Sequence, residues 1–211
     1  MRGLLHVWSP RAKGGGDIVK DAILRKARES ADVKEQFFRA EADRIEALAR
    51  AMADAFERGG RLYVMGNGGG ATDAQHVAVE FCHPIVEKRR ALPALALTTD
   101  PALLTAISND RDFAKVFGDQ LRLLARPGDM ALTLSTSGQS PNLVHALEVA
   151  REVGLMTIAF TGKDGGRVAT LADHAFVVPS FSIHRIQETH VALYHIVWDL
   201  VHVAFGEDDV L

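Results

Sequence analysis

The stretch Met130–Asn142, which reads MALTLSTSGQSPN, gives the clearest indication of the fold class. Its first five residues form a short apolar run, as expected of a strand that is buried on both faces of a sheet. A turn rich in serine and threonine follows. Ser140 and Pro141 then suit the start of a helix, because serine is a favoured N-cap and proline fits the first helical turn. The stretch therefore predicts a buried strand that leads through a polar turn into a helix.

The same alternation continues on both sides of this stretch. Four more apolar runs have the length of strands: 62–65, 94–97, 156–160 and 175–178. Helical patterns lie between and after the runs, over 70–86, 101–124, 141–153, 164–171 and 183–205. Strand–helix alternation predicts a parallel sheet with helices on both faces, and ligands of such sheets bind at the carboxyl ends of the strands. The predicted fold class is therefore α/β, a doubly wound parallel sheet.

Residues 17–58 carry apolar side chains at helical spacing, and Gly59-Gly60 ends the pattern. We predict a pair of helices there, with a break near 31–33. These helices are too apolar to stand free of a partner surface, which favours an oligomer. Residues 1–16 end in three glycines and are predicted to be a flexible tail. A single domain is predicted over 17–211.

The composition excludes several classes of protein. The net charge is -3, with 47% hydrophobic and 24% charged residues, which is ordinary for a soluble domain. No basic character favours nucleic acid or an anionic membrane as a partner. The single cysteine, Cys82, excludes an internal disulfide and fits a reducing compartment. With no apolar run of membrane-spanning length and no secretory signal pattern, we expect a cytoplasmic protein.

The turn after 130–134 is a candidate anion site. Four hydroxyls lie at or beside a helix N-terminus, where free amides and the helix dipole favour negative charge: Ser135, Thr136, Ser137 and Ser140. The absence of lysine from this turn argues against a Walker-type nucleotide loop. The alternative is an ordinary turn whose side chains only cap the helix.

A glycine-rich turn, Gly66-Asn67-Gly68-Gly69-Gly70, follows the run 62–65. Glycines let a backbone approach a ligand closely. The spacing differs from the dinucleotide-binding fingerprint, and a tight connection without a ligand is the alternative.

The helix after the glycine-rich turn carries Asp73, His76 and Glu80 on one face, because they are three and four residues apart. A histidine and a glutamate one turn apart can share a divalent metal ion such as Zn²⁺. The alternative is a solvated polar stripe.

The last helical pattern is rich in histidine. Gln187 and His195 are eight residues apart, about 12 Å along an ideal helix, so spacing alone does not predict that they share an ion. A helical wheel instead aligns His184, Glu188, His195 and His202. That stripe is either a competing metal site or a polar face.

Six motifs, in this order, resemble those of the phosphoheptose isomerase branch of the sugar isomerase (SIS) domain family. They are Gly66–Gly69, Asp73–His76, Leu92–Asp100, Ser135–Gly138, Thr161–Gly166 and Arg185–His190. The likeness covers residues 17–205. It implies a three-layer, flavodoxin-like sheet of five parallel strands and a homotetramer with sites at subunit interfaces. It also implies an enzyme that interconverts sedoheptulose 7-phosphate and D-glycero-D-manno-heptose 7-phosphate.

The resemblance also assigns roles to residues. Ser135, Thr136, Ser137 and Ser140 match the positions that hold the phosphate, and Asn67, Gly68, Asp100 and Gln187 match positions that bind the substrate. The family's zinc ligands, one ion per subunit, match His76, Glu80, Gln187 and His195. Glu80 also matches the proposed base, and His195 the proposed acid.

The chain departs from the family pattern at three positions. Gly70 stands where serine is usual, Pro84 stands where arginine is common, and His184 precedes Arg185. These departures leave open an isomerase of another phosphosugar. The family also contains non-catalytic proteins that bind the bacterial replication initiator, and phosphosugar-sensing modules are a further alternative. The presence of both Glu80 and His195 favours an enzyme.

Overall fold

The structure is a computed structural model and describes residues 15–85 and 89–209. Its centre is a sheet of five parallel strands in the order β2-β1-β3-β4-β5. The strands are β1 (Leu62–Gly66), β2 (Ala94–Ala96), β3 (Met130–Ser135), β4 (Met156–Gly162) and β5 (His174–Val178). This strand order is that of the flavodoxin-like doubly wound fold, so the predicted fold class is confirmed.

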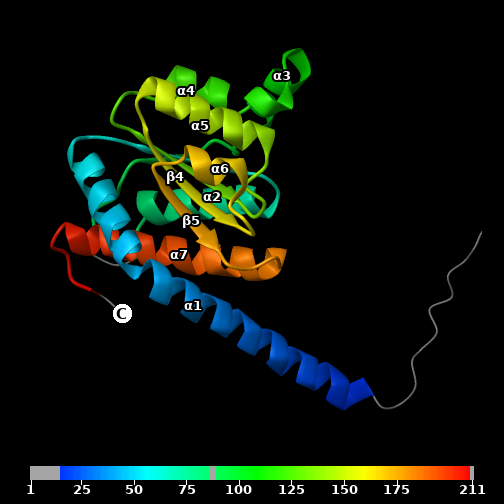
Figure 1. The fold of residues 1–211 in the computed structure, drawn as a ribbon. Coiled ribbons are helices and arrows are strands. Elements are labelled where there is room, and N and C mark those ends of the chain that lie inside the picture. The colour runs from blue at the N-terminus through cyan, green and yellow to red at the C-terminus, as the bar shows by residue number, and fades with distance from the viewer. Residues whose placement is uncertain (1–14, 86–88, 210–211) are drawn as a thin grey trace, which may run out of the picture.

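Helices cover both faces of the sheet (Figure 1). They are α1 (Gly15–Glu57), α2 (Gly69–Cys82), α3 (Pro101–Asp110), α4 (Gly118–Leu124), α5 (Pro141–Val153), α6 (Gly166–Leu171) and α7 (Ile183–Ala204). One core cluster joins α1, α2 and α7 to one face of the sheet, and a second joins α4, α5 and α6 to the other. Within the described ranges, no helix is both long and apolar enough to cross a membrane.

The strands are apolar because both of their faces are buried. Along β1, Leu62 and Val64 belong to one core cluster, while Tyr63 and Met65 belong to the other. All residues of β1 and β3 are buried. Such strands read as continuous apolar runs, which explains why the sequence locates all five to within two residues of their observed ends.

The predicted pair of helices over 17–58 is wrong, because α1 is a single helix over Gly15–Glu57. No glycine or proline lies between residues 17 and 57, so nothing in the chain forces a break. Phe37 is buried, and Val33 packs against the same core, where the break was expected. The beginning of α1 extends away from the rest of the molecule (Figure 1). Of the predicted tail, residues 1–14 lie outside the described residues, and Gly15 and Gly16 begin α1.

Two further helix boundaries differ from the prediction. The helix expected over 101–124 is divided into α3, a 3₁₀ turn at Phe113–Lys115 and α4. Asp112 caps the 3₁₀ turn by accepting a hydrogen bond from the backbone N–H of Ala114. The helix expected over 70–86 ends at Cys82, because Pro84 cannot continue it and disfavours helical backbone at His83.

The connections after β1 and β3 leave the sheet toward opposite faces. The chain passes from β1 into α2, on the face with α7, and from β3 into α5, on the other face. Because β1 and β3 are neighbours, their carboxyl ends form the topological switch point at which doubly wound sheets bind ligands. This arrangement brings the glycine-rich turn and the serine-rich turn side by side.

Candidate active site

The serine-rich turn after β3 is organised by its own hydroxyls. Ser135 Oγ accepts a hydrogen bond from the Gly138 backbone N–H at 3.0 Å, and Ser137 Oγ accepts one from Gln139 at 3.3 Å. Gly138 has φ +63°, and a Cβ there would collide with the carbonyl oxygen of Gly165. Only glycine therefore fits at this point of the turn.

Ser140 occupies the N-cap position of α5, as predicted, and Pro141 follows it at the first helical position. Its hydroxyl makes no capping hydrogen bond to the described first turn of α5. The Leu143 N–H donates to the Ser140 carbonyl oxygen, and Pro141 has no N–H. The Ser140 hydroxyl and the backbone N–H of Asn142 therefore remain available to a ligand beside them.

The glycine-rich turn after β1 faces the serine-rich turn. Asn67 and Asn142 join the two turns through a pair of side-chain hydrogen bonds. The backbone at Gly69 lies against the Gln187 amide, so a side chain at position 69 would collide with it. A Cβ at Gly70 would lie 2.8 Å from the Leu134 carbonyl oxygen, so a serine there would require a backbone shift. The departure from the family pattern at Gly70 thus fits the close approach of α2 to β3.

A pocket of about 160 Å³ lies between these turns and α7. Six residues assigned to substrate binding by the resemblance line it: Asn67, Ser135, Thr136, Ser137, Ser140 and Gln187. Its other lining residues are Gly69, Gly70, Asp73, Leu134, Ile183 and His190. Hydroxyls and free amides at a helix N-terminus make the β3 side of this pocket suitable for an anion such as phosphate.

Asp100 and Gly68, the other two predicted substrate-binding residues, are not among the residues that line the pocket. The Asp100 carboxylate accepts a hydrogen bond from the Leu103 backbone N–H at 2.9 Å and caps α3. Gly68 has φ +54° and occupies the N-cap of α2. In this chain both residues shape the start of a helix.

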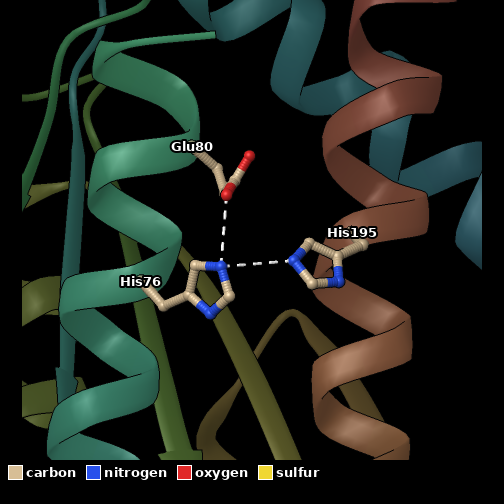
Figure 2. A group of neighbouring side chains, drawn as sticks. All are labelled: His76, Glu80 and His195. Atoms are coloured by element: carbon tan, nitrogen blue, oxygen red, sulfur yellow. Dashed lines mark hydrogen bonds and ion pairs between the residues drawn. The ribbon is translucent and has the colours of Figure 1, made fainter. Parts of the chain in front are cut away.

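Three predicted metal ligands converge from α2 and α7 (Figure 2). His76 Nε2 lies 3.1 Å from Glu80 Oε1 and 3.4 Å from His195 Nε2. One ligand atom from each residue lies within 4.8 Å of the others. The sequence spacing of His76 and Glu80 within one helix predicts that they lie close together. The approach of His195 depends on the packing of α7 against α2, which the spacing does not predict.

The chemistry of this cluster, and the two separations measured from His76 Nε2, fit a metal ion such as zinc. Tetrahedral ligands at about 2.0–2.1 Å from one ion lie about 3.3 Å apart, close to the two separations measured from His76 Nε2. Burial and the nearby His76 lower the pKa of His195, while Glu80 acts in the opposite direction. A lowered pKa keeps the imidazole neutral near pH 7, which is the form that binds a metal ion.

Gln187, the fourth predicted ligand, donates a hydrogen bond from Nε2 to Asp73 Oδ2 at 2.9 Å. Burial raises the pKa of the Asp73 carboxyl, and the hydrogen bond from Gln187 works against that shift. The pair connects α2 to α7 within the lining of the pocket. Gln187 would bind a cation through its side-chain carbonyl oxygen, Oε1.

The competing stripe of His184, Glu188, His195 and His202 does not form a metal site of its own among the described residues. His184 is exposed at the start of α7, and His202 is buried with Nδ1 3.0 Å from Glu207 Oε2. Glu188 accepts a hydrogen bond from Ser30 on α1. Of the four stripe residues, His195 alone belongs to the described metal cluster.

Three residues around the site were not singled out from the sequence. Asn142 holds Asn67, and Tyr194 places its hydroxyl 2.8 Å from His76 Nδ1. His190 is buried in the pocket wall, and its Nε2 donates to the Thr161 carbonyl oxygen at 3.0 Å. The sequence predicts Asp73 on the His76 face of its helix, but spacing alone does not identify Gln187 as its partner.

The family model described as SIS domain matches residues 27–162. The phosphoheptose isomerase of Thermodesulfovibrio yellowstonii is 46% identical over 183 residues, which cover 87% of this chain and 91% of that protein. The phosphoheptose isomerase of Aquifex aeolicus is 45% identical over 181 residues, covering 86% of this chain and 95% of that protein.

Solved structures of phosphoheptose isomerases are also similar to this chain. The phosphoheptose isomerase of Neisseria gonorrhoeae superposes with a TM-score of 0.81 at 36% identity, covering 87% of this chain and 98% of that one. The phosphoheptose isomerase of Francisella tularensis superposes with a TM-score of 0.82 at 33% identity, covering 88% and 98%. The similarity therefore extends over nearly the whole of both solved chains.

Proposed function

Since the chain belongs to the phosphoheptose isomerase branch of the SIS domain family, we propose that it is a ketose–aldose isomerase acting on a heptose phosphate. The reaction is the conversion of sedoheptulose 7-phosphate to D-glycero-D-manno-heptose 7-phosphate. The observation that carries the proposal is the meeting of two features at one edge of the sheet. A pocket suited to phosphate lies between the serine-rich turn and helices α2 and α7, and the cluster of His76, Glu80 and His195 is carried by the same two helices.

Aldose–ketose isomerisation moves a proton between two adjacent carbons through an enediol or enediolate. The reaction needs a base at the C–H bond, an acid at the carbonyl oxygen and stabilisation of the negative charge that develops on that oxygen. The step balances in protons: the base takes one from the first carbon and delivers one to its neighbour, the carbonyl oxygen gains one, and the adjacent hydroxyl loses one.

Glu80 is the proposed base. Its side chain is 17% exposed, and one carboxylate oxygen faces His76 while the other points away (Figure 2). His195 is the proposed acid, since a neutral imidazole retains one N–H with which it can protonate the substrate oxygen. His76, Glu80, Gln187 and His195 would hold a Zn²⁺ ion, which would supply positive charge to orient the substrate and stabilise the oxyanion.

The phosphate is remote from the reacting carbons and contributes by binding. The hydroxyls of Thr136, Ser137 and Ser140 and the first turn of α5 support its placement at the carboxyl end of β3. Interactions with a remote group position the reacting carbons and so lower the barrier to the chemical step.

Proton NMR of the purified protein with sedoheptulose 7-phosphate tests this function, with and without a chelator. We expect an aldoheptose 7-phosphate to appear, and we expect chelation to stop its formation and added Zn²⁺ to restore it. Absence of conversion by zinc-loaded protein would contradict the heptose assignment.

A second candidate is an isomerase of another phosphosugar. The departures at Gly70 and Pro84 favour it, since Gly70 lines the pocket and Pro84 directly follows the residue that caps α2. The helix nevertheless continues through Cys82, beyond Glu80, so Pro84 does not remove the proposed base from its helix. Phosphosugars of five, six and seven carbons, compared by kcat/KM in the same assay, separate the two candidates.

We also propose that the protein works as a homotetramer in the cytoplasm. Ile18, Val19, Ile23 and Leu24 on the projecting part of α1 are 57–73% exposed, which supports a partner copy there. The homotetramer, with sites shared between subunits, is implied by the resemblance. Neither a membrane nor a nucleic acid is expected as a partner, since the net charge is only -3.

A further inference from the structure

Tyr194 contacts the proposed metal site from behind one of its ligands. The tyrosine lies on α7, next to His195, and its hydroxyl oxygen is 2.8 Å from His76 Nδ1 on α2. The centres of the Tyr194 and His76 rings are 5.2 Å apart in an edge-to-face arrangement. Tyr194 therefore joins the two helices that carry the metal ligands.

His76 has two ring nitrogens with different surroundings. Nε2 faces Glu80 and His195, so it is the nitrogen that would bind a cation (Figure 2). A neutral imidazole that binds a cation through Nε2 carries its proton on Nδ1, and that N–H needs an acceptor. The Tyr194 hydroxyl oxygen is the acceptor at this position.

A hydroxyl suits this position because it can reverse its role. With no cation, the His76 Nε2–H can donate to Glu80 while Tyr194 donates its O–H to Nδ1. With a cation at Nε2, the Nδ1–H donates to the Tyr194 oxygen. One hydrogen bond thus serves both states without movement of the ring.

Tyr194 is more buried than the ligand that it contacts. Tyr194 is 2% exposed, whereas the His76 side chain is 44% exposed, and the His76 ring contacts the rings of Tyr194 and His195. Of the hydrogen bonds described for His76, the one to Tyr194 reaches the nitrogen that faces away from Glu80 and His195. Partners of this kind orient metal-bound histidines, and their loss typically lowers metal affinity about 10–100-fold.

We propose that Tyr194 is a positioning residue that fixes the ring orientation and the tautomer of His76 for metal binding. This inference rests on the metal site of the proposed function, and it adds a residue that does not itself contact the ion.

The test compares two variants that each lose one buried hydroxyl. Tyr194→Phe keeps the ring contacts and removes the hydrogen bond to His76. Tyr63→Phe is the matched control, because Tyr63 is the only other tyrosine and is also 2% exposed. Its hydroxyl donates to the Leu124 carbonyl oxygen at 3.0 Å, on the opposite face of the sheet from α7.

Zinc affinity is measured by competition with a chromophoric chelator, and the His76 ring nitrogens are observed by ¹⁵N NMR. We expect Tyr194→Phe to bind Zn²⁺ about 10–100-fold more weakly than the unmodified protein. We expect Tyr63→Phe to bind it within about twofold, because the lost hydroxyl is remote from the ligands. In the zinc-loaded protein, the Nδ1–H proton of His76 should be protected from exchange, and Tyr194→Phe should remove that protection.

The outcomes separate this inference from the proposed function. Suppose that the unmodified protein binds Zn²⁺ tightly and that Tyr194→Phe has the same zinc affinity and the same His76 Nδ1 signal. That result would overturn the positioning role and leave the proposed isomerase function intact. Failure of the unmodified protein to bind Zn²⁺ would overturn the metal site of the proposed function, and this inference with it. An equal loss of affinity in both tyrosine variants would show a general effect of a lost hydroxyl and would also overturn the positioning role.

Discussion

Asn67 and Asn142 exchange two hydrogen bonds across the switch point of the sheet. Asn67 Nδ2 donates to Asn142 Oδ1 at 2.9 Å, and Asn142 Nδ2 donates to Asn67 Oδ1 at 2.8 Å. Asn67 belongs to the turn after β1, whereas Asn142 belongs to the first turn of α5. The pair therefore holds the glycine-rich wall of the pocket at a fixed distance from its serine-rich wall.

Asn142→Ala should weaken substrate binding without removing any group that lines the pocket. The change leaves both side-chain groups of Asn67 without their partner, which costs about 1–3 kcal/mol and loosens the turn. We expect KM to rise about 5–100-fold with a smaller change in kcat. Asn109→Ala is the control, because Asn109 is exposed and donates to Asp110 in α3. Equal KM values for Asn142→Ala and the control would contradict the coupling of the two walls.

Ser137→Ala should weaken phosphate binding. Ser137 lines the pocket in the turn before α5, and its loss leaves one phosphate oxygen without a donor at a cost of about 1–3 kcal/mol. The inhibition constant of inorganic phosphate and the KM for the phosphosugar are measured for each variant. Both should rise in Ser137→Ala. Ser108→Ala in α3 is the control, since Ser108 is not among the residues that line the pocket. An unchanged phosphate inhibition constant would place the phosphate elsewhere.

Protonation of His190 should destabilise the folded protein in mild acid. Burial lowers the pKa of His190 to about 4, from an ordinary value near 6.5. Between those two pH values the unfolded chain binds more protons than the folded one, so stability falls as the pH falls. From pH 7 to pH 5 the loss from this group is about 2 kcal/mol.

His190→Gln is the matched variant, because its amide can still donate to the Thr161 carbonyl but does not titrate. Urea unfolding at fixed protein concentration gives the free energy of unfolding at pH 7 and at pH 5. The difference between the two should be about 2 kcal/mol smaller in His190→Gln. The same pH dependence in both proteins would show that His190 is not held neutral.

Ile23→Asp should weaken the proposed assembly. Ile23 is 61% exposed on the projecting part of α1, and burying a carboxylate in a partner interface is unfavourable. Light scattering at micromolar concentration should give a smaller mass than that of the unmodified protein. Ala47→Asp is the control, at an exposed position of α1 nearer the core. A monomeric unmodified protein would contradict the tetramer, and an Ile23→Asp tetramer would contradict this interface.

The fold was readable from the sequence because its strands are buried on both faces. Each such strand appears as an apolar run, and Gly59-Gly60 and Ser140-Pro141 mark element boundaries by their own backbone preferences. The continuity of α1 was missed because its apolar pattern does not reveal how tightly Phe37 is packed. The division of the segment after Asp100 was missed because its capping residue, Asp112, lies inside an otherwise helical pattern.

The site was readable only in part. His76 and Glu80 lie on one helix, so their spacing was sufficient to pair them. His195, Tyr194 and Asn142 act across elements, and their contacts depend on how α7 and α5 pack on the rest of the fold. The family resemblance supplied His195 as a ligand, but it supplied neither Tyr194 nor Asn142.

Glu80→Gln should remove most of the turnover, because an amide cannot accept the substrate proton. We expect kcat to fall by about 10²–10⁴-fold, the usual contribution of a positioned base, with phosphosugar binding largely retained in calorimetry. The control is Glu148→Gln, an exposed glutamate paired with Arg167 on the opposite face of the sheet. Substantial activity in zinc-loaded Glu80→Gln would show that Glu80 is not the base.

The most direct test of proton transfer by Glu80 is the incorporation of deuterium from D₂O, followed by NMR at C2 of the aldose product. A base that takes the proton from an enediol-forming carbon exchanges it with solvent, so the product should carry deuterium at C2. Glu80→Gln should slow both product formation and deuterium incorporation. Rapid turnover that leaves C2 free of deuterium after many cycles would contradict the enediol mechanism and the role of Glu80 in it.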